Sequence, residues 1–279
     1  DQTSFTNFDR VPDKNRQFRG SRKGDRKRRG VGRPVPAGKR PSERHKKRRA
    51  FKPNIPQHII MRAAPGMPSF RDEEIYQAIR NATFTAFRHD ELALDSENAS
   101  AATLREGRAF HIVHVSIQHA HVHLLVEASD RMALARGMQA FGISAARNIN
   151  AVRTRRARKA GKIGPREKLG GKVFADRYHA VQLTTPRQVR NCLAYVLNNW
   201  RHHDEDRRDR LVHPWKVDPY SSAISFGDWK EREHKVTLLK RPSWYDPLMV
   251  WFPKTWLLRV GWRRYGLISM FERPGGGDE

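Results

Sequence analysis

The chain has 279 residues, of which 55 are Lys or Arg and 29 are Asp or Glu, so its formal net charge is +26. Such an excess would repel itself unless a polyanion neutralised it, and we therefore expect a nucleic-acid partner. A single cysteine excludes an intrachain disulfide, and no apolar stretch suits a signal peptide or a membrane span, which predicts a cytoplasmic, nucleoid-associated protein.

Residues 1–54 are strongly basic and show almost no apolar periodicity. They hold 19 Lys or Arg against five acidic residues, with unbroken basic runs at 26–29 and 46–49. A segment of this composition cannot bury enough apolar surface to form a core. We predict a disordered basic arm that contacts phosphates without sequence preference.

From Ile55 onward, the spacing of apolar residues is that of a folded domain. The run 55–62 is rich in β-branched residues and ends before Pro65 and Gly66, which predicts a strand and a turn. Acidic residues at 72–74 and an apolar stripe after them predict a helix. The runs 109–117 and 121–127 predict an antiparallel hairpin, residues 130–153 a second helix, and residues 161–171 a basic loop.

Residues 172–184 are predicted to form another strand, and the helix after it has a clear start signal. Thr185 suits the N-cap, Pro186 the first helical position, and Gln188 completes a capping box, so a helix should run to about Trp200. This element order predicts an α+β fold with a ferredoxin-like antiparallel sheet. We expect a catalytic domain over 55–203 and a Trp-rich C-terminal extension over 204–279, whose tryptophans are expected mainly to pack.

Two histidines with one residue between them are the first candidate site. His121 and His123 lie in a strand-like run, and alternation sends both side chains to the same face of the sheet. Two adjacent imidazoles can bind one divalent metal, although histidines also decorate the polar faces of strands. His119 has the same parity and could add a ligand. RNA-binding domains of this topology usually carry aromatic residues on these strands, and the histidines favour an enzyme.

A tyrosine and an asparagine on the last helix are the second candidate site. Tyr195 lies away from the stripe that should be buried, and Asn199 follows one turn later on the same side. A phenol beside an amide oxygen resembles a nucleophile beside a metal ligand, although a tyrosine at a helix edge can also be a surface residue. The buried stripe is predicted to consist of Val189, Leu193, Val196 and Trp200.

These motifs together resemble those of a known enzyme family. Residues 121–126, HVHLLV, resemble the histidine-hydrophobe-histidine motif of single-tyrosine HUH transposases, and residues 193–199, LAYVLNN, resemble their tyrosine helix. Residues 173–179, VFADRYH, resemble the strand before that helix in the REP-associated tyrosine transposase branch. The resemblance implies that Tyr195 attacks DNA while His121, His123 and Asn199 hold a magnesium or manganese ion.

The resemblance also implies a substrate of single-stranded and hairpin DNA. We expect DNA contacts from Lys172, Arg177, Arg187 and Arg190, together with the basic arm. The chain departs from the family at two positions, with Ala120 where Asn is common and Trp200 where Pro is common, so no target sequence is carried over.

Two alternatives stay open from the sequence. Tyr178 is a competing nucleophile. The chain could also be a non-catalytic nucleic-acid-binding protein, either a domesticated transposase or an RRM-like binder. Its oligomeric state, monomer or dimer, is not predicted. A structural zinc site is disfavoured, because the cysteine and histidine spacing of closed zinc modules is absent.

Overall fold

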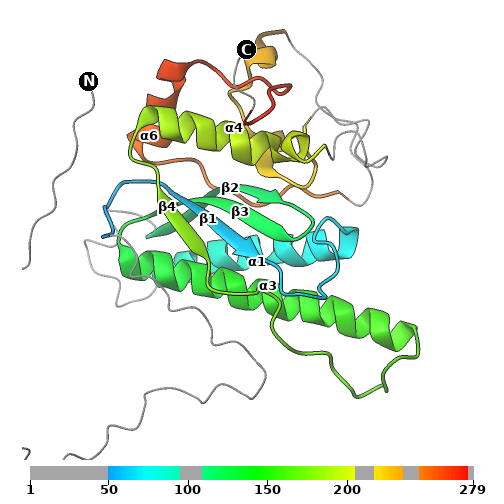
Figure 1. Ribbon diagram of the computed structural model, residues 1–279. Helices are drawn as coiled ribbons and strands as arrows, with labels where there is room; N and C mark the ends of the chain where they lie inside the picture. Colours follow the sequence, from blue (N-terminus) through cyan, green and yellow to red (C-terminus); the bar gives the residue numbers. More distant parts are fainter. Residues whose placement is uncertain (1–49, 95–108, 205–216, 235–244, 276–279) are drawn as a thin grey trace, which may run out of the picture. The chain divides into compact units, whose positions relative to one another are not determined.

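A four-stranded antiparallel sheet organises the chain (Figure 1). The computed structural model describes residues 50–94, 109–204, 217–234 and 245–275, and the predicted basic arm lies outside them apart from residues 50–54. The strand order is β2-β3-β1-β4, which confirms the predicted α+β class with a ferredoxin-like sheet. The strands are β1 (Gln57–Arg62), β2 (Phe110–Ile117), β3 (His121–Ala128) and β4 (His179–Gln182). The helices are α1 (Glu73–Leu94), α3 (Arg131–Lys159), α4 (Pro186–His202) and α6 (Trp256–Arg259).

The two faces of the sheet are covered by different helices. Figure 1 shows α1 and α3 on one face and α4 on the other. Strand alternation separates the two cores, because Val122 and Leu124 of β3 belong to the cluster under α1 and α3, whereas Leu125 belongs to the cluster under α4. The odd-numbered residues of β3, including both candidate histidines, therefore face α4.

Helix α4 begins where the sequence predicts. The Thr185 side chain accepts from the backbone N–H of Gln188, and the Gln188 side chain accepts from the backbone N–H of Thr185, so the capping box is complete. The helix ends at His202 and contains one residue with non-helical angles, Asn198 (φ −111°, ψ 18°). All four residues of the predicted stripe are buried: Val189, Leu193, Val196 and Trp200.

Two predicted element boundaries are wrong. Helix α3 extends six residues beyond Arg153, and its last turn carries basic residues that suit the negative end of the helix dipole. The predicted strand 172–184 is broken, since only 179–182 join β4. Ile60 pairs with His179, and Ala63 pairs with Phe174. The two pairs are three residues apart on the side of β1 but five residues apart on the opposite side, so residues 175–178 form a bulge.

The C-terminal residues complete both cores rather than forming a separate layer of their own. The backbone N–H of Trp251 donates to the carbonyl of Ile112 at the edge of β2 (2.8 Å). Further along β2, the backbone N–H of Ile117 donates to the backbone carbonyl of Tyr220 (2.9 Å). Trp229 and Trp262 are buried in the core under α4, as expected for packing tryptophans, whereas Trp256 is 48% exposed. Trp215 and Trp244 lie outside the described residues. Two short 3₁₀ helices, η1 (Ser222–Ser225) and η3 (Gly261–Tyr265), belong to this region, and a third, η2, spans Lys230–His234.

None of the helices in the described residues is long and apolar enough to cross a membrane.

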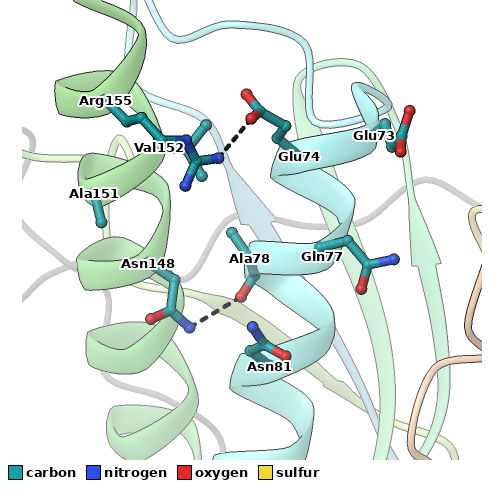
Figure 2. A pocket seen from close by; sticks show the side chains of 9 residues that line it. All are labelled: Glu73, Glu74, Gln77, Ala78, Asn81, Asn148, Ala151, Val152 and Arg155. Carbon is teal, nitrogen blue, oxygen red and sulfur yellow. Dashed lines mark hydrogen bonds and ion pairs between the residues drawn. The ribbon is translucent and has the colours of Figure 1, made fainter. Parts of the chain in front are cut away.

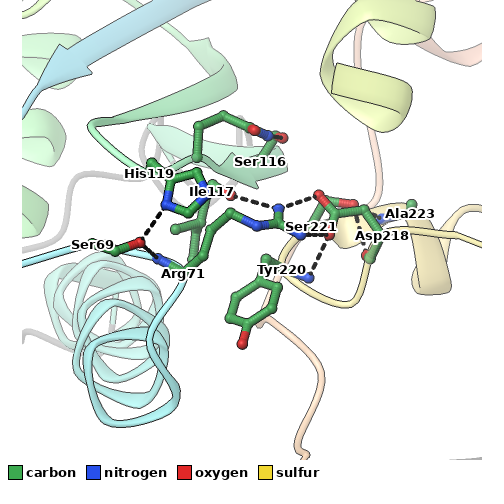
Figure 3. Close-up of polar contacts among 10 residues, drawn as sticks. Ser69, Arg71, Ser116, Ile117, His119, Asp218, Tyr220, Ser221 and Ala223 are labelled. Atoms are coloured by element: carbon green, nitrogen blue, oxygen red, sulfur yellow. Dashed lines mark hydrogen bonds and ion pairs between the residues drawn. The ribbon is translucent and has the colours of Figure 1, made fainter. Parts of the chain in front are cut away.

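A buried ion pair fastens the C-terminal region to the sheet (Figure 3). The Arg71 guanidinium donates to both carboxylate oxygens of Asp218 (3.0 Å each) and to the carbonyl of Ile117 (3.2 Å). Both charged side chains are almost fully buried, and the Tyr220 ring lies 4.4 Å from the guanidinium carbon. Geometry of this kind compensates the cost of burying two charges, whereas removing one partner leaves the other unpaired.

We expect Asp218→Ala to lower the free energy of unfolding by about 3–5 kcal/mol, because it leaves a buried guanidinium without its anion. The matched control is Asp228→Ala, which removes an exposed ion pair to Arg263 and should cost less than about 1 kcal/mol. Urea unfolding of the two variants measures both values. Equal losses would show that the buried pair does not fasten the C-terminal region.

Candidate active site

His121 and His123 face α4 and lie side by side. Their ring centroids are 4.7 Å apart, His123 is buried, and His121 is half-buried at the start of β3. Burial, with smaller contributions from neighbouring histidines, lowers the pKa of His123 to about 2 and that of His121 to about 4. Both imidazoles are therefore neutral near pH 7, the form in which histidine binds a metal.

Tyr195 points from α4 toward these histidines. Its ring centroid lies 5.2 Å from that of His123, with the two planes nearly perpendicular, and the tyrosine is half-buried. Burial raises the pKa of the phenol, Cys192 raises it slightly, and the Asn199 side chain opposes the rise. The helix thus presents a protonated phenol against a pair of neutral imidazoles.

Asn199 is fully buried one turn after Tyr195. Neither polar atom of its amide forms a hydrogen bond of standard geometry with any described residue, and the same holds for Nε2 of His123. The helix changes its dihedral angles at Asn198, whose Nδ2 donates to the carbonyl of Ser269 (2.9 Å). Buried polar atoms without partners are costly, so these atoms suit an additional group such as a cation.

The donor set at this site fits a divalent cation with mixed ligands. Across the ranges that the structure describes, no three His, Cys, Asp or Glu side chains are grouped so that they could hold a metal, so a third protein ligand must be of another type. Glu127 faces the same side of β3, but its carboxylate accepts from the backbone N–H groups of Lys254 and Thr255 (2.7 and 2.8 Å). Two imidazoles and the Asn199 amide oxygen remain as candidate ligands, a set that Mn²⁺ accepts more readily than Mg²⁺, which prefers oxygen ligands.

A third histidine belongs to the site and escaped the sequence analysis. Nε2 of His58 lies 3.0 Å from Nδ1 of His123, and the His58 ring is 6.1 Å from that of Tyr195. Burial, with a smaller effect of His179, lowers the pKa of His58 to about 4. The sequence signal that could have indicated His58 is its place in the alternation of β1, which puts its side chain on the same face of the sheet as His123 once β1 and β3 pair.

The end of α4 adds two further histidines. The His202 ring lies 5.7 Å from that of Tyr195, and the His203 ring lies 5.8 Å from that of His121. Nδ1 of His202 lies 3.0 Å from the carbonyl oxygen of Pro274 and must donate to it, since a carbonyl only accepts. In the neutral imidazole, Nε2 of His202 is then left as an acceptor.

Tyr178 and Cys192 lie in surroundings that disfavour nucleophilic attack. Tyr178 packs against the core under α1 and α3, on the opposite side of the sheet from Tyr195. Cys192 is buried, and burial raises the pKa of its thiol to about 12. His119 is turned to Ser69, whose hydroxyl lies 2.7 Å from its Nδ1. Of these side chains, Tyr195 has the surroundings that suit a nucleophilic role best.

The four cations expected to contact DNA differ in their surroundings. Lys172 and Arg177 are exposed. The Arg187 guanidinium lies over the Tyr265 ring at 5.2 Å, and Arg190 pairs with Glu272, with Nη2 2.7 Å from Oε2. Arg190 thus holds the C-terminal segment against α4, and DNA contact by all four residues remains a prediction.

A pocket of about 340 Å³ lies between α1 and α3, and none of its lining residues is a histidine (Figure 2). Arg155 pairs with Glu74 there, and Asn148 donates to the carbonyl of Ala78 (3.1 Å). These polar groups join the two helices to each other, so we assign the pocket to helix packing. The candidate site is on the other face of the sheet, under α4.

No family model and no curated protein matches the chain. Among solved structures, the chain is similar to one described as "Structure of the REP associates tyrosine transposase bound to a REP hairpin", with a TM-score of 0.38 and 11% sequence identity. The match covers 74% of this chain and 99% of that chain. Similarity at this level is distant and assigns no function.

Proposed function

We propose that the protein is a metal-dependent DNA endonuclease and strand transferase that uses Tyr195 as its nucleophile. The observation that carries the proposal is the contact of Tyr195 with His123, next to three buried polar atoms, Nε2 of His123 and both amide atoms of Asn199, that form no hydrogen bond of standard geometry with any described residue. A phenol, two neutral imidazoles and a buried amide fit a phosphoryl-transfer site better than a packing interface.

In the proposed reaction, the Tyr195 oxygen attacks a phosphodiester and the bond from phosphorus to the 3′ oxygen breaks. The products are a 5′-phosphotyrosine and a free 3′-hydroxyl, and attack by another 3′-hydroxyl reverses the step and joins strands. His121, His123 and Asn199 would hold the divalent cation, which supplies charge neutralisation for the phosphate. Nε2 of His202 is available to accept the phenol proton, which can return to the departing 3′ oxygen.

We propose single-stranded DNA next to a hairpin as the substrate. A flexible strand can bring its phosphate to a half-buried tyrosine, whereas a rigid duplex cannot do so without distortion. The basic end of α3 and the loop after it, with Arg158, Lys159 and Lys162 exposed or nearly so, suit the phosphates of the hairpin stem.

The test is incubation of the full chain with labelled hairpin DNA that carries single-stranded flanks, in the presence of Mn²⁺. Denaturing gels should show a shortened DNA strand and a protein band that carries the label. A second candidate function, non-catalytic nucleic-acid binding, is favoured by the net charge alone and predicts retarded DNA without an adduct. Binding without an adduct at any divalent metal concentration would overturn the proposed enzyme.

We expect deletion of residues 1–49 to weaken DNA binding and to reduce its dependence on salt. The deletion removes 18 Lys or Arg residues, so fewer counterions are released when DNA binds. It spares Phe51, which packs against the core, and Lys52, whose N–H donates to Gln182 (2.9 Å). The measurement is the slope of log affinity against log salt concentration.

The control is a chain in which residues 1–49 are replaced by an uncharged Gly/Ser segment of equal length. It should behave like the deletion, because charge rather than length sets the slope. A slope unchanged in both variants would show that the arm does not contact DNA.

A further inference from the structure

His58 on β1 contacts the proposed metal ligand His123 on β3 and has no role of its own in the proposed reaction. His58 is opposite Leu125 in the strand register, and His123 is opposite Ile60, so the two histidines are diagonal neighbours on one face. Their rings stack at 5.2 Å with an interplanar angle of 21°, and Nε2 of His58 is 3.0 Å from Nδ1 of His123. The strand pairing thus brings together residues that are 65 positions apart.

Either histidine can be the donor of this hydrogen bond. The two directions differ in whether Nε2 of His123 carries a proton or a lone pair. If His58 donates, the proton of the neutral His123 ring is on Nε2, a buried atom without an acceptor among the described residues. If His123 donates from Nδ1, its Nε2 carries a lone pair instead. Only the second arrangement lets His123 bind a cation through the buried atom.

We propose that His58 is a positioning residue that accepts the Nδ1 proton of His123 and so holds the Nε2 lone pair ready for a divalent cation. The proposal rests on the proposed function, because it supposes that His123 is a metal ligand. It also gives His58 no direct ligand role through Nε2, since that atom is occupied by His123. Partners of this kind fix the tautomer and the orientation of metal-binding histidines.

The test compares two substitutions of His58 with a histidine that faces the same side of the sheet. His58→Gln keeps an acceptor near the position of Nε2, whereas His58→Phe keeps a planar ring and removes the acceptor. The control is His179→Phe on β4, because His179 is opposite Ile60 rather than in contact with His123. Each full-length protein is titrated with Mn²⁺, and free Mn²⁺ is followed by electron paramagnetic resonance.

We expect His58→Phe to weaken Mn²⁺ binding about 10- to 100-fold, and His58→Gln and His179→Phe to change it less than about threefold. Equal affinity of His58→Phe and the wild type would overturn the positioning role, while loss of binding in His123→Ala would still support the proposed function. A wild-type protein that binds no Mn²⁺ would overturn both.

A second readout needs no variant and so does not depend on whether His58→Phe folds. Nitrogen NMR of the wild-type imidazoles with Mg²⁺ reports which nitrogen of His123 carries the proton. We expect the proton on Nδ1, with Nε2 unprotonated. A His123 ring protonated on Nε2 would overturn the positioning role of His58.

Discussion

Tyr195→Phe should reduce DNA cleavage and adduct formation to less than about one-thousandth of the wild-type rate while leaving DNA affinity nearly unchanged. The substitution removes only the hydroxyl proposed to attack phosphorus, and the ring keeps its contacts with His123 and with the core under α4. Affinity comes mainly from Lys and Arg contacts to phosphates, which the substitution does not touch. Single-turnover cleavage and equilibrium binding of the same labelled hairpin measure the two quantities.

The matched control for that substitution is Tyr178→Phe. Tyr178 packs against the core on the other side of the sheet and should tolerate loss of its hydroxyl with cleavage within a few-fold of the wild type. Cleavage by Tyr195→Phe at the wild-type rate would remove Tyr195 from the mechanism. If Tyr178→Phe were the inactive variant, the nucleophile would be assigned to the wrong face of the sheet.

The second large effect concerns the metal ligands. His121→Ala and His123→Ala should each lower cleavage more than about 100-fold, because one imidazole and one amide are too few protein ligands to hold a labile divalent cation. Asn199→Ala should act in the same direction by about tenfold, since water can replace an amide oxygen. Chelation of the metal should stop cleavage by the wild-type protein, and Mn²⁺ should restore it at least as well as Mg²⁺.

A control for general damage to the site is His203→Ala. His203 is exposed at the end of α4, and its ring lies 5.0 Å from that of His202 and 5.8 Å from that of His121. It is not one of the proposed metal ligands, so its removal should change cleavage less than tenfold. Undiminished cleavage in excess chelator, or by a variant without both His121 and His123, would show that the reaction does not need a metal held by these residues.

Local signals explain why much of the fold could be predicted. The capping box at Thr185 and the buried stripe of α4 depend only on residues within a few turns of one another. Strand alternation likewise placed His121 and His123 on one face. The order of strands and helices then sufficed for the ferredoxin-like sheet, and the sheet brought the histidines under the tyrosine helix.

Long-range pairing explains what could not be predicted. His58 enters the site only through the register of β1 against β3, which no short pattern encodes. The bulge at 175–178 depends on the pairing of residues 173–175 with β1, and the partner of Arg190, Glu272, is 82 residues away. The segment that carries Ser269 and Pro274 has no periodic spacing of apolar residues that would predict a helix or a strand. Its carbonyl oxygens nevertheless accept hydrogen bonds from the side chains of Asn198 and His202 at the end of α4.

The central claim is a covalent bond between Tyr195 and DNA, and peptide mass spectrometry tests it most directly. The wild-type protein is incubated with Mn²⁺ and hairpin DNA, digested with nuclease and protease, and searched for tyrosine peptides with added nucleotide mass. We expect the modification on Tyr195, with a free 3′-hydroxyl on the released DNA strand. Modification of another residue, or cleaved DNA with no modified peptide, would contradict it.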